Sequence, residues 1–341
     1  MEQDHQQDFA EQLQVLTKRV LSRATTVPYL ATTTLPPMRY SCQITREPIV
    51  NCVYEPSMAF ILQGGKNSIV GNREFTYGAG ATFAVSVHIP STYRFIDISP
   101  EKPFVGLHFV LDRDILSRLL EQIGADYFIA QSRQQQEASV IVDVDDPAAS
   151  LMGEVSEFRL EQGSQAEAKA EQDCYGVSLD RMTPAIVDVL LQLTQLEAEG
   201  SERDKKVLGQ LLISQLYYHM LMSKHGVHFF NYYYQKATHK GIIRSVEFIQ
   251  KHFREDFDID KVASEVAYMQ PSSFFKHFKS STGFTPLQFK KRLRLLAAKK
   301  LMEVEHFTVS RSAYEVGYES VAQFSRDFKQ LFHVSPSSFV A

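Results

Sequence analysis

The sequence lacks the features that mark secreted and membrane proteins. Its 341 residues include only three cysteines, none in a C-x-x-C pair, namely Cys42, Cys52 and Cys174. So few cysteines cannot form a disulfide framework, which favours a reducing compartment. No apolar run approaches the roughly 18 residues that span a bilayer, and the N-terminal stretch has acids and glutamines in place of a signal peptide's basic start and apolar run. We therefore expect a cytoplasmic protein without a membrane partner.

A strong overall charge is also absent, but the two parts of the chain differ in sign. The net charge is −4. Residues 240–341 contain 16 Lys and Arg against 11 Asp and Glu, or +5, so the preceding 239 residues contain 20 against 29, or −9. Between Glu265 and Glu303 lie 37 residues without an acid and with eight basic side chains. A merely solvated surface mixes both signs, so an acidic body with a basic, polyanion-binding module is indicated.

The basic module contains an internal repeat with a period of 50 residues. Residues 258–289 align without a gap on residues 308–339, with nine identities where chance gives about two. The identical pairs are Ala263/Ala313, Glu265/Glu315, Val266/Val316, Tyr268/Tyr318, Phe274/Phe324, Phe278/Phe328, Lys279/Lys329, Pro286/Pro336 and Phe289/Phe339. The module therefore holds two copies of one supersecondary unit.

Each copy has the pattern of a helix, a tight turn and a second helix. Asp258 or Asp260 can cap the first helix, and residues 268–270 form the turn. The second helix starts at Pro271, where a missing N–H costs nothing. Phe274, four residues before a second phenylalanine, directs this helix at the core. A helix-turn-helix unit of this kind places its second helix in the DNA major groove.

The outward face of each second helix carries basic side chains. Lys276 and Arg326 occupy equivalent positions, from which a long cationic side chain can reach base edges. Lys279 and Lys329 lie one turn further on and suit phosphates, which position the protein without reading sequence.

Residues 286–303 have the apolar spacing of one helix that connects the two copies. Its basic side chains cluster beside the first copy's second helix. Of these we assign Lys290 and Arg292 to phosphate contacts.

Residues 241–341 resemble the AraC/XylS-type DNA-binding domain. The stretch VGYESVAQFSRDFKQLFHVSP (316–336) is similar to that family's signature over nearly its whole length, and FFKHFKSSTGFTPLQF (274–289) fits as well. The resemblance implies two helix-turn-helix units joined by a long helix. It also implies base contacts at Ser272, Phe275, Lys276, Gln323 and Arg326. His333 stands where the family usually has glycine.

The acidic body is β-rich over residues 40–112. Short β-prone runs at 58–64, 66–70, 73–77, 81–90 and 103–112 are separated by glycine turns, which is typical of a small barrel or sandwich. An amphipathic helix is expected over 7–23, a helix over 112–124, and two more within 181–225. The apolar stripes of this last pair suit either the core or a dimer face.

Residues 54–90 resemble the cupin-like N-terminal domain of one branch of AraC-type regulators, with looser similarity over about 40–200. The resemblance implies a barrel that senses a ligand and dimerises. The mouth of a small barrel is a concave apolar pocket. As candidate effector-binding residues we take Phe60, Leu62, His88 and His108.

A metal-dependent cupin enzyme with a helical tail is the alternative interpretation. Such enzymes carry an H-x-H pair followed by a glutamate, but His88 and His108 are twenty residues apart. The chain contains no H-E-x-x-H, G-x-S-x-G or P-loop motif, so we expect no catalytic residue, metal or cofactor. His219, His225 and His228 are spaced too loosely for a firm metal site. Cys42 and Cys52 sense redox state only if a thiol pKa is lowered. A protein-interaction module without DNA binding is a third possibility.

The sequence thus predicts an α+β protein in three parts. Residues 1–39 form an N-terminal helical arm, 40–235 a cupin-like effector-binding and dimerisation domain with helices after the barrel, and 236–341 an all-α DNA-binding domain with two helix-turn-helix units. We expect a cytoplasmic, sequence-specific transcription regulator, in the first instance an activator that contacts RNA polymerase. Its partners would be double-stranded DNA, a small-molecule effector and a second copy of the chain.

Overall fold

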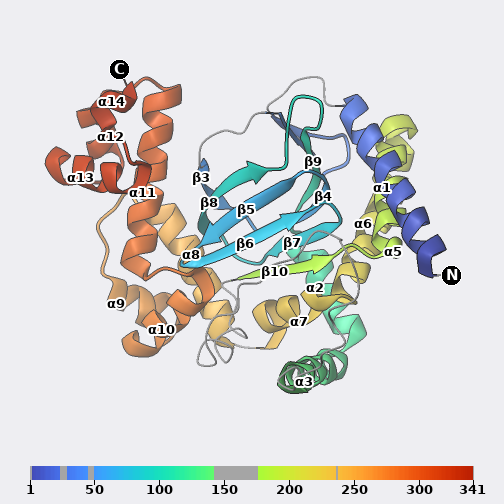
Figure 1. The fold of residues 1–341 in the computed structure, drawn as a ribbon. Helices are drawn as coiled ribbons and strands as arrows, with labels where there is room; N and C mark the ends of the chain where they lie inside the picture. The colour runs from blue at the N-terminus through green and yellow to red at the C-terminus, as the bar shows by residue number, and fades with distance from the viewer. Residues whose placement is uncertain (1, 24–28, 45–49, 142–175, 236, 341) are drawn as a thin grey trace.

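The computed structural model describes residues 2–23, 29–44, 50–141, 176–235 and 237–340, and Cys174 lies outside these ranges. The protein has an N-terminal domain of two antiparallel sheets flanked by helices, followed by a C-terminal helical domain (Figure 1). The α+β prediction is therefore confirmed. Within the described residues, no helix is long and apolar enough to cross a membrane.

In the described part of the N-terminal domain, ten strands form two sheets. The larger sheet has the order β1 (Tyr29–Thr32), β2 (Met38–Gln43), β9 (Phe104–Val110), β4 (Ser57–Gln63), β7 (Ala81–Val85), β10 (Val177–Arg181). The smaller has the order β3 (Val50–Tyr54), β8 (Ile89–Ile96), β5 (Gly65–Val70), β6 (Arg73–Gly78). The predicted runs 58–64, 66–70, 73–77 and 103–112 correspond to β4, β5, β6 and β9. The run 81–90 is two strands, because β7 ends at Val85 and β8 begins at Ile89.

Helices cover the outer face of the larger sheet. These are α1 (Glu2–Arg23), α5 (Pro184–Glu199) and α6 (Glu202–Leu221), and Figure 1 shows them on the side opposite the C-terminal domain. Alternate side chains of β4, among them Met58 and Phe60, point into the apolar core under these helices. The helix α2 (Arg113–Ile123) follows β9 and is capped by Asp112, as the predicted helix over 112–124 requires. The helices α3 (Ala125–Ile141) and α7 (Lys224–Phe230) lie along the lower edge in that view.

The C-terminal domain follows the 50-residue repeat. A π-helix, η2 (Asn231–Gln235), leads to α8 (Ala237–His252). The first unit then has α9 (Ile259–Lys261), a π-helix η3 (Val262–Val266) and α10 (Pro271–Thr282); the second has α12 (Val309–Glu315) and α13 (Val321–Phe332). The connecting helix α11 (Pro286–Val304) matches its predicted range to within one residue, and α14 (Pro336–Val340) ends the described chain.

The apolar interior is divided unequally. One core lies between the larger sheet and its helices. A second runs without interruption from the space between the two sheets, through Ile61, Phe83 and Phe104, into the first helix-turn-helix unit at Phe274 and Phe278. A third belongs to the second unit and the end of α11 alone. The domain formed by the two sheets, called the barrel from here on, therefore shares one core with the first unit. The second unit does not contribute to this core.

Candidate nucleic-acid interface

The second helix of each helix-turn-helix unit is anchored by two phenylalanines. Phe274 and Phe278 of α10, and Phe324 and Phe328 of α13, are all 0% exposed. The two rings of each pair lie one helical turn apart in tilted contact, with centroids 5.4 Å and 5.5 Å apart. Pro271 begins α10, as predicted for a proline at the first helical position. The two helices are thus fixed in the same way, each with its opposite side toward solvent.

The outward sides of α10 and α13 carry most of the predicted base-reading residues. Exposed there are Ser272, Lys276 and Lys279 on α10, and Gln323, Arg326 and Lys329 on α13. Phe275 differs, because it is half-buried and packs against the shared core with its ring 6.0 Å from that of Phe274. Each helix therefore presents one central cation with a lysine one turn further on.

The C-terminal ends of α10 and α13 use the same left-handed residue. Gly283 closes α10 with φ 79°, and His333 closes α13 with φ 62°. In both cases the cap N–H bonds to the carbonyl of the residue four earlier, Lys279 or Lys329. Histidine adopts this conformation less readily than glycine, so the departure from the family pattern at His333 changes the strain of the turn and leaves its geometry intact.

A nearly buried carboxylate lies beneath the outward side of α13. Asp327 is 8% exposed. Its Oδ1 accepts from Lys291 Nζ at 3.2 Å and from Gln323 Nε2 at 3.1 Å, and its Oδ2 accepts from the Tyr318 hydroxyl at 3.2 Å. Burial and the neighbouring Asp327 carboxylate raise the pKa of Tyr318. The Oε1 atom of Gln323 accepts from Arg326 Nη2 at 2.7 Å.

The connecting helix α11 holds its basic side chains differently from the sequence-based assignment. Lys290 is 7% exposed, with Nζ 3.9 Å from the Phe257 ring and 3.8 Å from Asp256. Burial lowers the pKa of Arg292, whose guanidinium lies 4.6 Å from the centre of the Phe284 ring. The predicted phosphate contact at Lys290 does not fit this burial. Arg292 packs against an aromatic ring, which does not fit a phosphate contact either.

The barrel touches the first helix-turn-helix unit directly. A Cβ atom on Gly71, in the turn between β5 and β6, would lie 2.8 Å from the Cα of Gly283. Nearby, the Tyr232 hydroxyl donates to the carbonyl of Ser281 at 3.2 Å. On α2 and α8, Arg113 and Glu247 form an ion pair of 2.6 Å. The first helix-turn-helix unit is therefore joined to the two-sheet domain through the turn after α10 and through α8.

The space between the two sheets contains a cation surrounded by aromatic rings. Lys66 Nζ on β5 lies 4.1 Å from the ring centre of Tyr93, 5.1 Å from Phe95 and 5.4 Å from Phe104. Burial lowers the pKa of this ammonium to about 8. Among the described residues, no carboxylate forms an ion pair with Lys66. Lys66 carries no signal in the sequence, since an isolated lysine in a strand usually faces water.

The four candidate effector residues are divided among three places. His108 on β9 is close enough for Lys66 to act on it electrostatically; burial, with Arg39 and Lys66, lowers its pKa to about 4. Phe60 and Leu62 are 0% and 3% exposed and lie in the core under α1, α5 and α6. Their side chains face away from the other sheet, so an effector role between the sheets does not fit them.

His88 lies near the junction with α2 and α8. Burial and the charge of Arg113 lower its pKa, while Glu55 and Glu247 oppose the shift. The Nδ1 atoms of His88 and His108 are buried without a hydrogen-bond partner in the described part of the chain.

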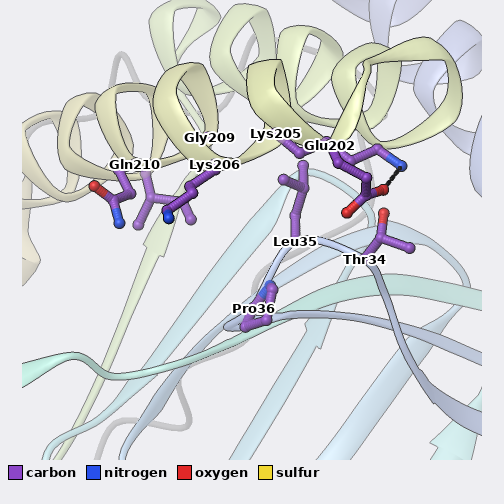
Figure 2. A pocket seen from close by; sticks show the side chains of 9 residues that line it. Thr34, Leu35, Pro36, Glu202, Lys205, Lys206, Gly209 and Gln210 are labelled. Carbon is purple, nitrogen blue, oxygen red and sulfur yellow. Dashed lines mark ion pairs between the residues drawn. The ribbon is translucent and has the colours of Figure 1, made fainter.

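A separate hollow of about 350 Å³ lies outside the barrel, between the turn that follows β1 and the helix α6 (Figure 2). Its lining includes Thr34, Leu35 and Pro36 from the turn, and Lys205 with Glu202, which pair at 3.6 Å, from α6. None of the predicted effector residues lines it.

His225 and His228, near the end of the N-terminal domain, have structural contacts. His225 is bonded on both ring nitrogens, to Thr82 Oγ1 at 2.7 Å and Ser178 Oγ at 2.9 Å, and His228 Nε2 lies 2.7 Å from Ser86 Oγ. They join α7 to β7 and β10. In the part of the chain that the structure describes, no group of three or more His, Cys, Asp or Glu could hold a metal ion.

Cys42 and Cys52, the cysteines in the described ranges, show no sign of an activated thiol. Burial raises the pKa of Cys42, and it raises the pKa of Cys52 to about 12 despite the charge of Lys66. A redox or electrophile sensor needs the opposite shift.

Comparison with known proteins agrees with this architecture. The fold and the paired units define a helix-turn-helix protein with an N-terminal β-sandwich domain. Residues 35–228, more than half of the chain, match the family described as AraC-type transcriptional regulator N-terminus, and residues 252–341 match a helix-turn-helix domain. The chain belongs to the AraC-type transcriptional regulators, as its sequence motifs indicate.

Individual relatives are distant. LumQ, a probable transcriptional regulator of Photobacterium leiognathi, is 27% identical over 162 residues, which are 48% of this chain and 61% of LumQ. The transcriptional activator RhaS of Salmonella schwarzengrund is 26% identical over 171 residues, 49% of this chain and 58% of RhaS. The matches thus span about three fifths of these relatives. The solved structure of ToxT from Vibrio cholerae is 13% identical with a TM-score of 0.47, covering 92% of this chain and 98% of ToxT.

Proposed function

We propose that the protein is a cytoplasmic, sequence-specific DNA-binding regulator, without catalytic activity, whose two readers α10 and α13 enter successive major-groove segments. The observation that carries the proposal is the matched pair of helices with buried phenylalanines inside and Lys276 or Arg326 outside. Base contacts are assigned to Ser272, Lys276, Gln323 and Arg326, and phosphate contacts to Lys279 and Lys329. In this proposal residues 236–341 form the DNA-binding domain and 40–235 the effector and dimerisation domain. The arm, 1–39, is not separate from that domain, because it contributes α1 and the edge strand β1 to it.

Selection of bound fragments from a randomised DNA pool tests this function. We expect a motif with two elements about ten base pairs apart, one helical turn. Arg326→Ala should lose preference at one base pair, at a cost of about 1–3 kcal/mol, whereas Lys329→Ala should weaken all sequences alike. If both variants lost affinity equally for every DNA sequence, the assignment of Arg326 to a base contact would be wrong. No enrichment by the wild type would remove the function itself.

An activator role, through contact with RNA polymerase, is part of the proposal. Its support is the name of RhaS, a transcriptional activator. Transcription in vitro from a promoter with the selected motif upstream should rise when the protein is added. A fall would instead identify a repressor.

The effector in this proposal is a small apolar molecule with an anionic group, bound between the two sheets. The support is Lys66, an ammonium among three rings without a carboxylate partner in the described chain, with His108 close by. A bound anion would gain a charge-assisted hydrogen bond worth about 1.5–3 kcal/mol.

Lys66→Met tests this site. Octanoate and phenylbutyrate should raise the melting temperature of the wild type, and the variant should bind them at least about tenfold more weakly. The corresponding uncharged alcohols serve as matched probes, which the variant should bind no less well than the wild type. Equal stabilisation of both proteins by the carboxylates would place the effector elsewhere.

The homodimer partner is assigned to the exposed face of α6. Val207, Leu208, Leu211 and Tyr218 are 54%, 47%, 63% and 44% exposed and fall on one side of the helix. Such a contiguous apolar stripe marks an interaction surface. It is centred near Leu211, so two antiparallel copies of α6 would bury the same residues on both sides, as a twofold axis demands.

Leu211→Asp is expected to weaken the dimer at least tenfold in sedimentation equilibrium, because a carboxylate would be buried at the centre of the interface. Gln210→Asp introduces the same charge one residue earlier, about 100° around the helix, and should have little effect. A wild type that stays monomeric at micromolar concentration would contradict the assignment.

A further inference from the structure

The two helix-turn-helix units share a backbone but differ in what lies beneath their reading faces. In the second unit, three donors converge on the nearly buried carboxylate of Asp327, from Lys291 on α11, Tyr318 in the turn and Gln323 on α13. The equivalent position of the first unit, 50 residues earlier, is His277. An ionised carboxylate accepts hydrogen bonds and donates none. All three donor groups therefore point toward it.

The consequence for Gln323 is a fixed amide. Its Nε2 donates to Asp327 at 3.1 Å, and its Oε1 therefore faces the other way, where it accepts from Arg326 Nη2 at 2.7 Å. Arg326 is exposed and long, so holding it in one rotamer normally costs side-chain entropy on binding. The contacts from Asp327 through Gln323 already restrict the Arg326 side chain in the free protein, so less side-chain entropy is lost when DNA binds.

The first unit cannot build this chain. Ser273, Lys276 and His277 stand where the second unit has Gln323, Arg326 and Asp327. A serine hydroxyl is too short to bridge the two side chains. Tyr268, the counterpart of Tyr318, is 75% exposed and lies 5.2 Å beneath the Arg244 guanidinium. In the described residues nothing equivalent restrains Lys276.

We propose that Asp327 is a positioning residue that orients Gln323 and Arg326 for base reading, which makes the second unit the stringent reader and leaves the first adaptable. The proposal rests on the DNA-binding function proposed above. Asp327 touches no base; it acts through Gln323, and its buried position ties the reading face of α13 to α11 through Lys291.

The test compares discrimination with overall affinity. Two DNA probes are used. One is the site selected by the wild type, and the other is the same site changed at the base pair for which Arg326→Ala abolishes the preference. Asp327→Asn keeps the side-chain shape but offers one acceptor oxygen to three donors. It should lower the ratio of the two affinities about tenfold and change binding to unrelated DNA less than twofold. His277→Asn, at the equivalent site of α10, is the matched control and should leave this ratio unchanged.

A double variant separates positioning from folding. If Asp327 acts through Arg326, Asp327→Asn should not lower the ratio of the two affinities any further in a protein that already carries Arg326→Ala. Asp327→Ala, checked for an unchanged far-UV spectrum at the assay temperature, should repeat the loss. An unchanged ratio, an equal loss on all DNA, or additivity with Arg326→Ala would each overturn the proposal. Failure of the underlying function looks different, since the wild type itself would then show no preferred sequence.

Discussion

Phe328→Ala is expected to unfold the second helix-turn-helix unit while the barrel and the first unit stay folded. The Phe328 ring is 0% exposed and lies 4.4 Å from that of Phe332 and 5.7 Å from that of Phe339. Truncating such a ring costs about 3–5 kcal/mol. The third core is small and confined to residues 295–339, and a core of this size supplies about that much stability in total.

The matched variant Phe278→Ala removes the equivalent ring from the core that the first unit shares with the barrel. The same loss is then distributed over a larger cooperative unit, so the barrel's own transition should move to lower temperature. Scanning calorimetry with fragment-level hydrogen exchange distinguishes the two results. A single transition that both variants shift equally would show that the second unit does not unfold by itself.

The second large effect is a loss of stability in acid. Burial lowers the pKa of His225 and of His228 to about 3, from an ordinary 6.5. Because the folded pKa lies below the unfolded one, their contribution is complete above pH 6.5 and declines as the pH falls from 6.5 toward 3. Each histidine removes about 1.4 kcal/mol per pH unit in that range, and a domain holds only about 5–15 kcal/mol in all.

Urea unfolding between about pH 7.5 and 4.5 measures this slope. His228→Gln keeps an amide near the position of Nε2, within reach of Ser86 Oγ, and removes the titrating ring. The variant should therefore lose about 1.4 kcal/mol less per pH unit than the wild type. Identical slopes for both proteins would mean that His228 does not resist protonation in the folded state.

Local patterns were sufficient to predict the readers. The start of α10 follows from Pro271, and the inward sides of α10 and α13 follow from the phenylalanine pair that the 50-residue repeat presents twice. The apolar run around Phe60 was harder, since β4 is covered on both faces and its alternate residues enter different cores. An uninterrupted apolar run does not show which of Phe60 and Ile61 faces the space between the sheets.

Tertiary contacts decide the remaining differences. Lys290 belongs to a basic cluster in the sequence, but the side of α11 that it occupies is covered by Phe257. The strand β10 was not expected, because its partner β7 lies more than ninety residues earlier in the chain. Lys66 becomes notable only when β8 and β9 bring Tyr93, Phe95 and Phe104 around it.

The helix α11 sets the distance and the relative orientation of α10 and α13. The first unit is continuous with the barrel core, whereas the core of the second unit includes residues of α11 but none of the barrel. An α-helix advances about 1.5 Å and turns about 100° for each residue. One residue added within α11 would therefore barely lengthen the distance between the readers but would turn α13 away from the side that faces the same stretch of DNA. If α10 and α13 read DNA as proposed, the 19 residues of α11 set the angular phase of the two helices along the double helix as well as their separation.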